Sequence, residues 1–419
     1  MKKHVSWYVR GGMTMKIGYS FWGYLGDTKY DLQGNVASTP DGNAFYSWSI
    51  IHKLLEDGSE VYGIMPDRDY SAFCHYRDGK RLFKSWCTDQ RKKAYFGINN
   101  IWENDNFITT GNYSIISELA RDNQLYDYIA SFLDEVDIVL HEWRMPIPGR
   151  NIAVSARDYA NYQPDLDIQN CILKYFGEHH DKKLIIFDLD YKLDINELRK
   201  LPSCGNNIYV FELGYKLCSK YPNAYHVEIP FDFRYINEFD LTRYGTPYIN
   251  LVYVGNRYER DWCIDKYIPT EIRNVLVYGN WCESGRDSKE RWPNINFGNR
   301  AQTADMDSIY GNSKATILLA KKEYLENSFM TARILEAIFY GSVPLFIEEY
   351  GKETIEKYAG KLAPYLTVKS KADVIDCVYA LEDDELRINT IKYLREHLKF
   401  MDVENFVQKI YEVFLNDIF

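Results

Sequence analysis

Short apolar runs alternate with amphipathic stretches along most of the chain. In the first half, apolar runs fall at 15–20, 61–65, 136–140, 184–187, 208–211 and 224–229, and a helical run at 44–56 ends at Asp57-Gly58. Runs that are apolar throughout are typical of strands buried on both faces of a parallel sheet. The opening order of strand, loop, helix and strand therefore predicts a doubly wound α/β sheet.

A second series of the same kind begins after the turn-like residues 244–247. It holds strand patterns at 248–256, 275–278, 315–320 and 343–347 and a helical pattern at 328–340, and amphipathic helices follow from Ala372. We therefore predict two Rossmann-like domains, an acceptor-binding domain over 1–240 and a nucleotide-sugar-binding domain over 241–400. Residues 401–419 form a C-terminal helix that we expect to pack back on the first domain. Residues 66–110, rich in basic and aromatic side chains, interrupt the first series as an insertion.

Composition narrows the class of protein. The chain has 419 residues, of which 46% are hydrophobic and 26% charged, as in folded globular proteins, and its formal net charge is −10. An acidic protein has no overall attraction for a polyanion, so nucleic-acid binding would need a local basic surface. The eight cysteines include no Cys-x-x-Cys pair, and we expect reduced, mostly buried thiols. We see no signal peptide and no membrane-length apolar run, and we expect a cytoplasmic protein without a membrane partner.

The segment 326–344, with the sequence ENSFMTARILEAIFYGSVP, carries the most chemical information. Residues three apart share one face of a helix, so Arg333 and Glu336 project together. A helix start with an arginine suits a phosphate, and a carboxylate one turn later can accept ribose hydroxyls. An Arg–Glu pair on an ordinary helix face explains the spacing equally well.

A strand that ends in glycine marks a second candidate site. Gly255 lets the backbone approach a ligand closely, and Arg257 and Arg260 follow at the carboxyl end of that strand, where open α/β sheets bind ligands. The planar guanidinium group fits phosphate oxygens. The alternative is two solvated arginines behind an unremarkable glycine.

An Asp-x-Asp pattern, Asp188 and Asp190, leaves the apolar run at 184–187. Three interpretations remain open. The pair binds a divalent metal ion, one carboxylate is a general base for an acceptor hydroxyl, or both are polar residues that end a strand.

Two further segments are polar candidates in the first half. Asp41 and Asn43 lie in a turn before the helical run, where either is an ordinary helix cap or a contact for an acceptor or sugar. Residues 75–93 interleave aromatic and basic side chains, as nucleic-acid-binding surfaces do, although a solvated charged surface has the same composition. The candidate DNA contacts there are Arg77, Lys80, Arg81, Lys84, Arg91 and Lys92.

Taken in order, these segments resemble the β-glucosyltransferases of T-even bacteriophages, GT-B enzymes that transfer glucose from UDP-glucose to 5-hydroxymethylcytosine in duplex DNA. The resemblance is strongest over about 224–350, through the segments Tyr253-Val-Gly255, Val277-Tyr-Gly-Asn280, 327–336 and Ile347-Glu-Glu349. It implies a GT-B fold with two Rossmann-like domains facing across a cleft, a UDP-sugar donor and a hydroxymethylated pyrimidine in phage DNA as acceptor.

The resemblance also implies roles for individual residues. It places diphosphate and ribose binding on Arg333 and Glu336, further diphosphate contacts near Arg257 and Arg260, and the uracil pocket around 297–303. The family's strand-end motif resembles Asp190-Tyr-Lys-Leu193, which puts the general base on Asp190. The family's active-site glutamate near the first helix has no counterpart here, where Asp41 and Asn43 are nearest.

The Glu-x7-Glu signature of many retaining GT-B enzymes is absent, since the residue eight before Glu336 is Ser328. We therefore expect an inverting reaction by a monomer, in the host cytoplasm if a phage encodes it, with Mg²⁺ or Mn²⁺ not required. The alternatives are a GT-B transferase acting on a polysaccharide, lipid or protein, and a nucleotide-sugar-binding protein or epimerase that performs no transfer.

Overall fold

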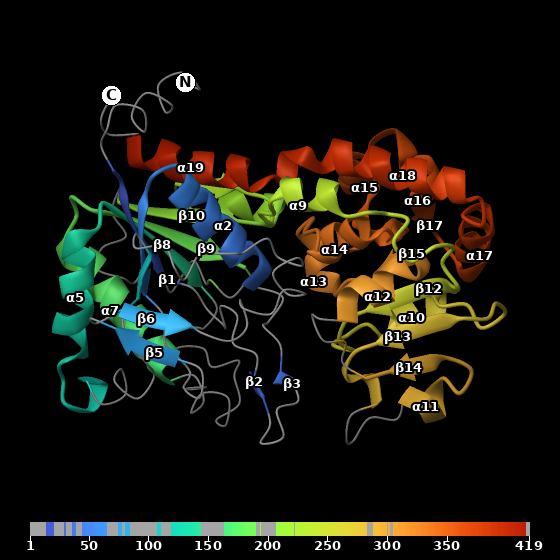
Figure 1. Ribbon diagram of the computed structural model, residues 1–419, viewed down its shortest axis with the longest axis horizontal. Coiled ribbons are helices and arrows are strands. Elements are labelled where there is room, and N and C mark those ends of the chain that lie inside the picture. The colour runs from blue at the N-terminus through green and yellow to red at the C-terminus, as the bar shows by residue number, and fades with distance from the viewer. Residues whose placement is uncertain are drawn as a thin grey trace. The chain divides into compact units, whose positions relative to one another are not determined.

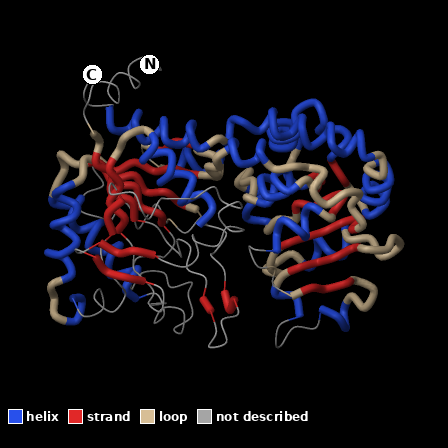
Figure 2. The backbone as a smooth tube through the Cα atoms, in the orientation of Figure 1, coloured by secondary structure: helices blue, strands red, loops and turns tan. Residues whose placement is uncertain are grey.

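The computed structural model describes residues 14–20, 29–30, 36–38, 44–64, 74–77, 80–83, 107–109, 119–143, 163–189, 193, 207–221, 223–282, 288–299, 301 and 305–415. The chain divides into two compact units (Figure 1). Unit 1 comprises residues 1–213, 217–230 and 403–419, and unit 2 comprises residues 214–216 and 231–402. Figure 2 shows that each unit contains its own sheet with helices around it.

Unit 1 is built on a seven-stranded sheet in the order β11-β10-β9-β8-β1-β4-β7. All neighbouring strands in it run parallel. The strands are β1 (Lys16–Ser20), β4 (Glu60–Ile64), β7 (Phe107–Thr109), β8 (Ile138–Trp143), β9 (Lys183–Asp188), β10 (Ile208–Glu212) and β11 (Ala224–His226). Outside this sheet, β2 (Lys29–Tyr30) pairs antiparallel with β3 (Val36–Ser38), and β5 (Cys74–Arg77) with β6 (Lys80–Phe83). The segment 66–110 therefore contains a hairpin and, in β7, an edge strand of the main sheet.

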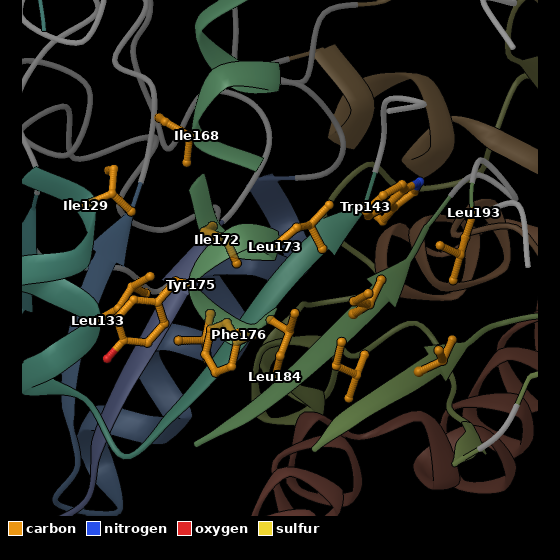
Figure 3. Packing of buried hydrophobic residues seen from close by; sticks show 14 of the residues in the cluster. Ile129, Leu133, Trp143, Ile168, Ile172, Leu173, Tyr175, Phe176, Leu184 and Leu193 are labelled. Carbon is orange, nitrogen blue, oxygen red and sulfur yellow. The ribbon is translucent and has the colours of Figure 1, made fainter. Parts of the chain in front are cut away.

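Helices cover both faces of this sheet because side chains alternate along each strand. On one face, Ile186 and Val210 join a buried cluster with α5 (Leu125–Glu135) and α7 (Gln163–Glu178), part of which Figure 3 shows. On the other face, Phe187 and Phe211 pack against Phe406 of α19 (Val403–Leu415), with ring centroids 4.9 and 5.4 Å away. The helix α19 also packs on α2 (Ala44–Glu56). The last helix of the chain is thus part of the unit that the first half builds.

Unit 2 holds a six-stranded sheet in the order β14-β13-β12-β15-β16-β17, again with all neighbours parallel. Its strands are β12 (Ile249–Val254), β13 (Val275–Tyr278), β14 (Asn296–Gly298), β15 (Ser313–Leu318), β16 (Val343–Ile347) and β17 (Thr367–Val368). Its α-helices are α9 (Phe233–Glu238), α10 (Asp261–Tyr267), α11 (Ser288–Arg291), α12 (Met306–Gly311), α13 (Lys322–Glu326), α14 (Arg333–Tyr340), α15 (Lys352–Ala359), α16 (Ala363–Leu366), α17 (Lys371–Ala380) and α18 (Asp384–His397). The doubly wound α/β architecture expected from the sequence is confirmed in both units.

The strand order places a topological switch point in each sheet. In unit 2 the chain runs from β12 outward to β14 and then returns to β15, which lies on the other side of β12. In unit 1 it runs from β1 outward to β7 and returns to β8, on the other side of β1. Open α/β sheets bind ligands beyond the carboxyl ends of the strands at such a point. A ligand is therefore expected beside the residues that follow β12 and β15 in unit 2, or beside those that end β1 and β8 in unit 1.

The helix predicted over 328–340 is wrong at its start. The preceding helix α13 ends at Glu326 with Asn327 as its C-cap, and Ser328 has a φ of +57°, a left-handed conformation that stops a right-handed helix. As a result α14 begins at Arg333, which becomes its first residue. The strand expected over 224–229 is also shorter and ends at His226.

The expectation of mostly buried thiols is wrong for the described cysteines. Only Cys263 is buried, Cys282 is exposed, and Cys171, Cys218 and Cys377 lie between.

Candidate functional site

Gly255 lies directly after β12 at the switch point of unit 2, and no larger residue fits there. A Cβ atom at this position would lie 2.6 Å from Nη2 of Arg333 and 2.5 Å from the hydroxyl oxygen of Tyr253. Both distances are far below van der Waals contact. The glycine therefore brings the backbone of the β12 loop against a guanidinium group.

A second glycine locks this loop to the next one. Gly279, after β13, has a φ of +142°, and a Cβ there would lie 2.2 Å from the carbonyl oxygen of Gly255. The indole N–H of Trp281 donates to the same carbonyl at 2.7 Å, and the amide of Arg257 donates to Oδ1 of Asn280 at 2.9 Å. The two loops are held together by these contacts, so the edge of the sheet is rigid where a ligand would approach.

Arg333 is half-buried and is the first residue of α14. Its Nε donates to the carbonyl of Val254 at 2.5 Å, and its Nη1 lies 3.4 Å from Oγ1 of Thr331. No carboxylate of the described residues comes within 4 Å of the guanidinium, and Nη2 donates no hydrogen bond within that set. The cap residue of α14, Ala332, offers no side chain to the first-turn amides. The amides of Ile334 and Leu335 already donate to the carbonyls of Thr331 and Ala332, so the group suited to an anion here is the guanidinium of Arg333.

Glu336 lies one turn further along α14 and accepts a hydrogen bond from the hydroxyl of Tyr310 at 3.0 Å. Burial raises the pKa of Glu336, while the charge of Arg333 and the Tyr310 hydrogen bond act in the opposite direction. Tyr310 itself is fully buried and stacks on Tyr340. The structure thus orients one carboxylate oxygen through Tyr310, and Arg333 and Glu336 are close enough to affect each other electrostatically.

Arg257 is paired with carboxylates. Its Nε and Nη2 donate to both oxygens of Asp261 at 2.7 Å, and Arg291 donates to the same carboxylate at 2.7 Å. Its Nη1 also lies 3.3 Å from the hydroxyl of Ser288. This predicted donor-binding side chain therefore points into an ion-pair network with α10 and α11.

Arg260 is buried, with 2% of its surface exposed, and it donates to backbone carbonyls. Its Nε reaches Leu319 at 3.4 Å, and its Nη1 reaches Asn256 and Tyr258 at 3.2 Å. It therefore joins the loop after β12 to the end of β15, the two strands of the switch point. The positive charges of Arg260 and Arg333 both act to lower the pKa of Tyr350.

Sequence reasoning missed three tyrosines at this site: Tyr253, Tyr310 and Tyr350. The first and last have hydroxyl groups that are shielded from solvent and have no hydrogen-bond partner among the described residues. A usable signal existed for Tyr253, because side chains two apart on a strand share a face and Gly255 follows at that spacing.

In unit 1 the described part of the Asp-x-Asp pattern is Asp188, which is fully buried at the end of β9. Its Oδ2 accepts from the amide of Leu193 at 3.1 Å and so holds the chain after the strand. Asp190, Asp41 and Asn43 lie outside the described residues.

Several buried polar side chains lie at the ends of β1 and β8. The sequence analysis did not single them out. The carboxylate of Glu142 accepts from the hydroxyls of Tyr19 and, at 2.8 Å, Ser47. The ring of His141 lies 2.9 Å from Ser20 Oγ and 3.0 Å from Gln169 Oε1, and burial lowers its pKa to about 4. The signal for this group was the pair His141-Glu142 directly after an apolar run.

Half of the six candidate DNA contacts lie outside the described residues. The backbone of Arg77, Lys80 and Arg81 forms the β5–β6 hairpin, in which Arg77 pairs with Lys80 and Tyr76 with Arg81. Lys84, Arg91 and Lys92 lie outside the described residues. The segment expected to hold uracil begins at β14, where the ring of Phe297 stacks on Trp281 with centroids 5.8 Å apart.

The described residues contain no group of three or more His, Cys, Asp or Glu side chains arranged to hold a metal ion. None of their helices combines the length and apolar character needed to span a bilayer.

Solved structures resemble the whole chain. No protein-family model and no curated protein sequence matches it. The T4 phage β-glucosyltransferase in complex with UDP and Mn²⁺ is 15% identical, with a TM-score of 0.53 over 96% of this chain and 99% of that one. An α-glucosyltransferase in complex with UDP and a 13-mer DNA containing an HMU base is 11% identical, with a TM-score of 0.53 over 96% and 100%.

The Anabaena protein HepE in complex with UDP-glucose is also 11% identical, with a TM-score of 0.54 over 96% and 100%. At such identities the likeness concerns the fold. The chain therefore has the GT-B fold predicted from its sequence, with one Rossmann-like sheet in each unit.

Proposed function

We propose that the protein is a glycosyltransferase that takes its sugar from a UDP-sugar, with UDP-glucose as the first candidate. The observation that carries the proposal is the guanidinium of Arg333, which packs against Gly255 at the switch point of unit 2 and forms no ion pair with a carboxylate of the described residues. Structurally similar proteins have been solved with UDP or UDP-glucose. An anion with several acceptor oxygens would complete this site, and a diphosphate has that chemistry.

In this proposal Arg333 binds the diphosphate and Glu336 binds the ribose. Glu336 already accepts from Tyr310 through Oε2, and its other oxygen can accept from ribose hydroxyls. We assign Arg257 and Arg260 smaller donor-binding roles, because one is paired with Asp261 and the other holds backbone carbonyls. Their positive charges nevertheless favour the growing negative charge on a departing diphosphate.

The proposed reaction is an inverting displacement. Asp190 takes the proton of the acceptor hydroxyl, the hydroxyl oxygen forms a bond to C1 of the sugar, and the bond from C1 to the phosphate oxygen breaks. UDP leaves with that electron pair, and Asp190 holds the proton. A divalent Mg²⁺ or Mn²⁺ ion would supply further stabilisation of the diphosphate charge, and no step of the proposal depends on it.

For the acceptor we propose a 5-hydroxymethylated pyrimidine in duplex DNA. The support is the basic, aromatic segment 75–93 and the similarity to a glucosyltransferase solved with DNA containing an HMU base. Because the chain carries a net charge of −10, such binding requires this local basic surface. A polysaccharide, lipid or protein hydroxyl is the alternative acceptor.

The test is transfer of labelled glucose from UDP-glucose to three duplexes of one sequence, containing 5-hydroxymethylcytosine, 5-hydroxymethyluracil or cytosine. We expect label on the hydroxymethylated duplexes alone. Asp190→Asn should reduce transfer by about 100-fold or more while UDP binding stays unchanged. Asp181→Asn, at an exposed turn before β9, is the matched control.

Transfer to none of the duplexes but to a glycan, lipid or protein would overturn the DNA acceptor alone. No transfer to any hydroxyl, with UDP still bound, would favour a nucleotide-sugar-binding protein or an epimerase. Full activity of Asp190→Asn would remove that residue from the mechanism.

A further inference from the structure

Two tyrosine hydroxyls at the switch point of unit 2 have no visible structural purpose. Tyr253 is fully buried and Tyr350 is 2% exposed. Neither hydroxyl oxygen has a hydrogen-bond partner among the described residues. A buried hydroxyl without a partner lowers stability by about 1–3 kcal/mol relative to a bonded one. Two such groups at one place call for an explanation other than packing.

The two tyrosines come from different elements, and both lie near Arg333. Tyr253 lies in β12, and its ring is 5.4 Å from the guanidinium carbon of Arg333. Tyr350 ends the 3-10 turn η7 (Glu348–Tyr350) after β16. Burial raises the pKa of Tyr350, and the nearby charges of Arg333 and Arg260 lower it. Both tyrosines therefore lie in the electrostatic field of Arg333.

The arginines near these hydroxyls can only donate hydrogen bonds. Guanidinium groups only donate hydrogen bonds, and a tyrosine hydroxyl both donates and accepts. A ligand that satisfies all of them must offer several acceptor oxygens on a small, negatively charged group. The absence of a side chain at Gly255 lets the Tyr253 hydroxyl and Nη2 of Arg333 both lie against its backbone, since a Cβ there would be 2.5 Å and 2.6 Å from them.

We propose that the hydroxyls of Tyr253 and Tyr350 are additional ligands of the diphosphate, donating hydrogen bonds to phosphate oxygens that Arg333 draws into the site. This inference rests on the proposed function and extends it. The hydroxyls remain without partners until the anion arrives, so their hydrogen bonds add to binding rather than to folding. Both tyrosines bind the sugar-nucleotide, and neither is the base that removes the acceptor proton.

The experiment compares Tyr253→Phe and Tyr350→Phe with the unchanged protein by isothermal titration calorimetry. The titrants are UDP, uridine and inorganic pyrophosphate. The control is Tyr358→Phe, a buried tyrosine of α15 that packs on Phe400. Because a hydrogen bond to a charged group is lost, each test variant should bind UDP and pyrophosphate about tenfold more weakly. Uridine affinity should not change, and the control should match the unchanged protein throughout.

Thermal unfolding of the nucleotide-free variants gives an independent readout. Each phenylalanine removes a buried hydroxyl that has no partner, so the Tm should equal or exceed that of the unchanged protein. A hydroxyl held by a structural water would give the reverse pattern, a lower Tm and unchanged UDP affinity. That pattern, or UDP affinities within twofold of the unchanged protein in both variants, overturns the inference.

The proposed function and the proposed role of the two tyrosines can be contradicted separately. If the unchanged protein binds UDP but the variants bind it equally well, only the role of the tyrosines is lost. If the unchanged protein binds pyrophosphate in a tyrosine-dependent way but binds UDP no better, the anion site stands and the nucleotide assignment fails. If it binds neither, both proposals are wrong.

Discussion

Arginines in unit 2 differ in what surrounds their charge. Arg395 is buried and donates to the carbonyls of Ile338 and Phe339 at 2.8 and 2.6 Å, so its donors are used within the fold. Arg257 is neutralised by a bidentate pair with Asp261. Arg333 alone in this comparison has neither a carboxylate nor a full set of carbonyls. A half-buried charge left in that state is costly unless a ligand completes it, which is why the proposal begins there.

Replacing Arg333 with lysine keeps the charge and removes the planar fork. We expect UDP to bind at least tenfold more weakly, because an ammonium group cannot form the parallel hydrogen bonds of a guanidinium. Calorimetry with Arg273→Lys, an exposed arginine of the same unit, provides the matched control. Equal UDP affinity in Arg333→Lys would show that the site needs only a positive charge.

Glu336 gives a pH-dependent prediction. Burial raises its pKa in the folded protein, so the folded state holds the proton more tightly than the unfolded state. The contribution of this group to stability is then present below the ordinary pKa of a glutamate and is lost as pH rises through the folded value. Glu336→Gln should therefore have an equal or higher Tm at pH 7, and this advantage should vanish in acid. A variant less stable at pH 7 would contradict the direction of the shift.

His141 gives a prediction of the opposite sign for how stability depends on pH. Its pKa falls from 6.5 to about 4 on burial, so the unfolded state binds the proton more tightly between these values. The neutral ring then contributes about 3 kcal/mol above pH 6.5, and this contribution is lost as pH falls towards 4. Urea unfolding between pH 7 and 4.5 should show a steep loss of stability in the unchanged protein and a shallower one in His141→Gln. Parallel curves would show that other groups dominate.

At the scale of elements, α14 is the helix that carries the candidate site, and α18 fixes its far end. Arg395 and Arg387 of α18 donate to carbonyls at the carboxyl end of α14, at Ile338, Phe339 and Gly341. Positive charge there also complements the helix dipole. A helix held so firmly at one end presents its first residue, Arg333, in a fixed place.

Removing the hydrogen bonds from Arg395 to α14 should lower the stability of the protein. Arg395→Met keeps most of the apolar stem but leaves the carbonyls of Ile338 and Phe339 without their donor. We expect the free energy of unfolding to fall by about 3 kcal/mol, because charge-assisted hydrogen bonds in a buried site are lost. Denaturant unfolding with Arg273→Met as the exposed control measures it. A loss below 1 kcal/mol would mean that α14 is held mainly by its apolar face.

The elements also show what the sequence can predict. The buried strands β13 and β16 fall at the predicted positions because continuous apolar runs have few alternative structures in a parallel sheet. The start of α14 was missed because it depends on a left-handed residue, Ser328, whose conformation is set by the surrounding fold. The spacing of Arg333 and Glu336 was predictable from helical periodicity, whereas Tyr350 comes from the 3-10 turn that follows β16. Its position follows from the strand order, which local patterns do not determine.

At the scale of the whole molecule, the last helix of the chain belongs to the unit that the first half of the chain forms. Unit 1 needs the last helix, α19, because Phe406 covers Phe187 and Phe211, and Lys183 donates to the carbonyl of Val413 at 2.8 Å. Unit 2, by contrast, is made almost entirely by the continuous stretch 231–402. The two sheets therefore depend on the C-terminus to different degrees.

Deleting residues 403–419 should expose one face of the unit 1 sheet and leave unit 2 intact. Hydrogen exchange followed by mass spectrometry should show lost protection in β9 and β10 and unchanged protection in β12 and β15. A truncation after Leu415 serves as the control, since it retains all of α19. Equal loss of protection in both sheets would show that the units do not fold independently.

The most direct test of the central claim is a crystal structure of the protein with UDP. The account predicts the diphosphate against the guanidinium of Arg333 and the backbone of Gly255, with the ribose hydroxyls at Glu336. UDP bound away from α14, or bound there with its phosphates turned away from Arg333, would contradict it.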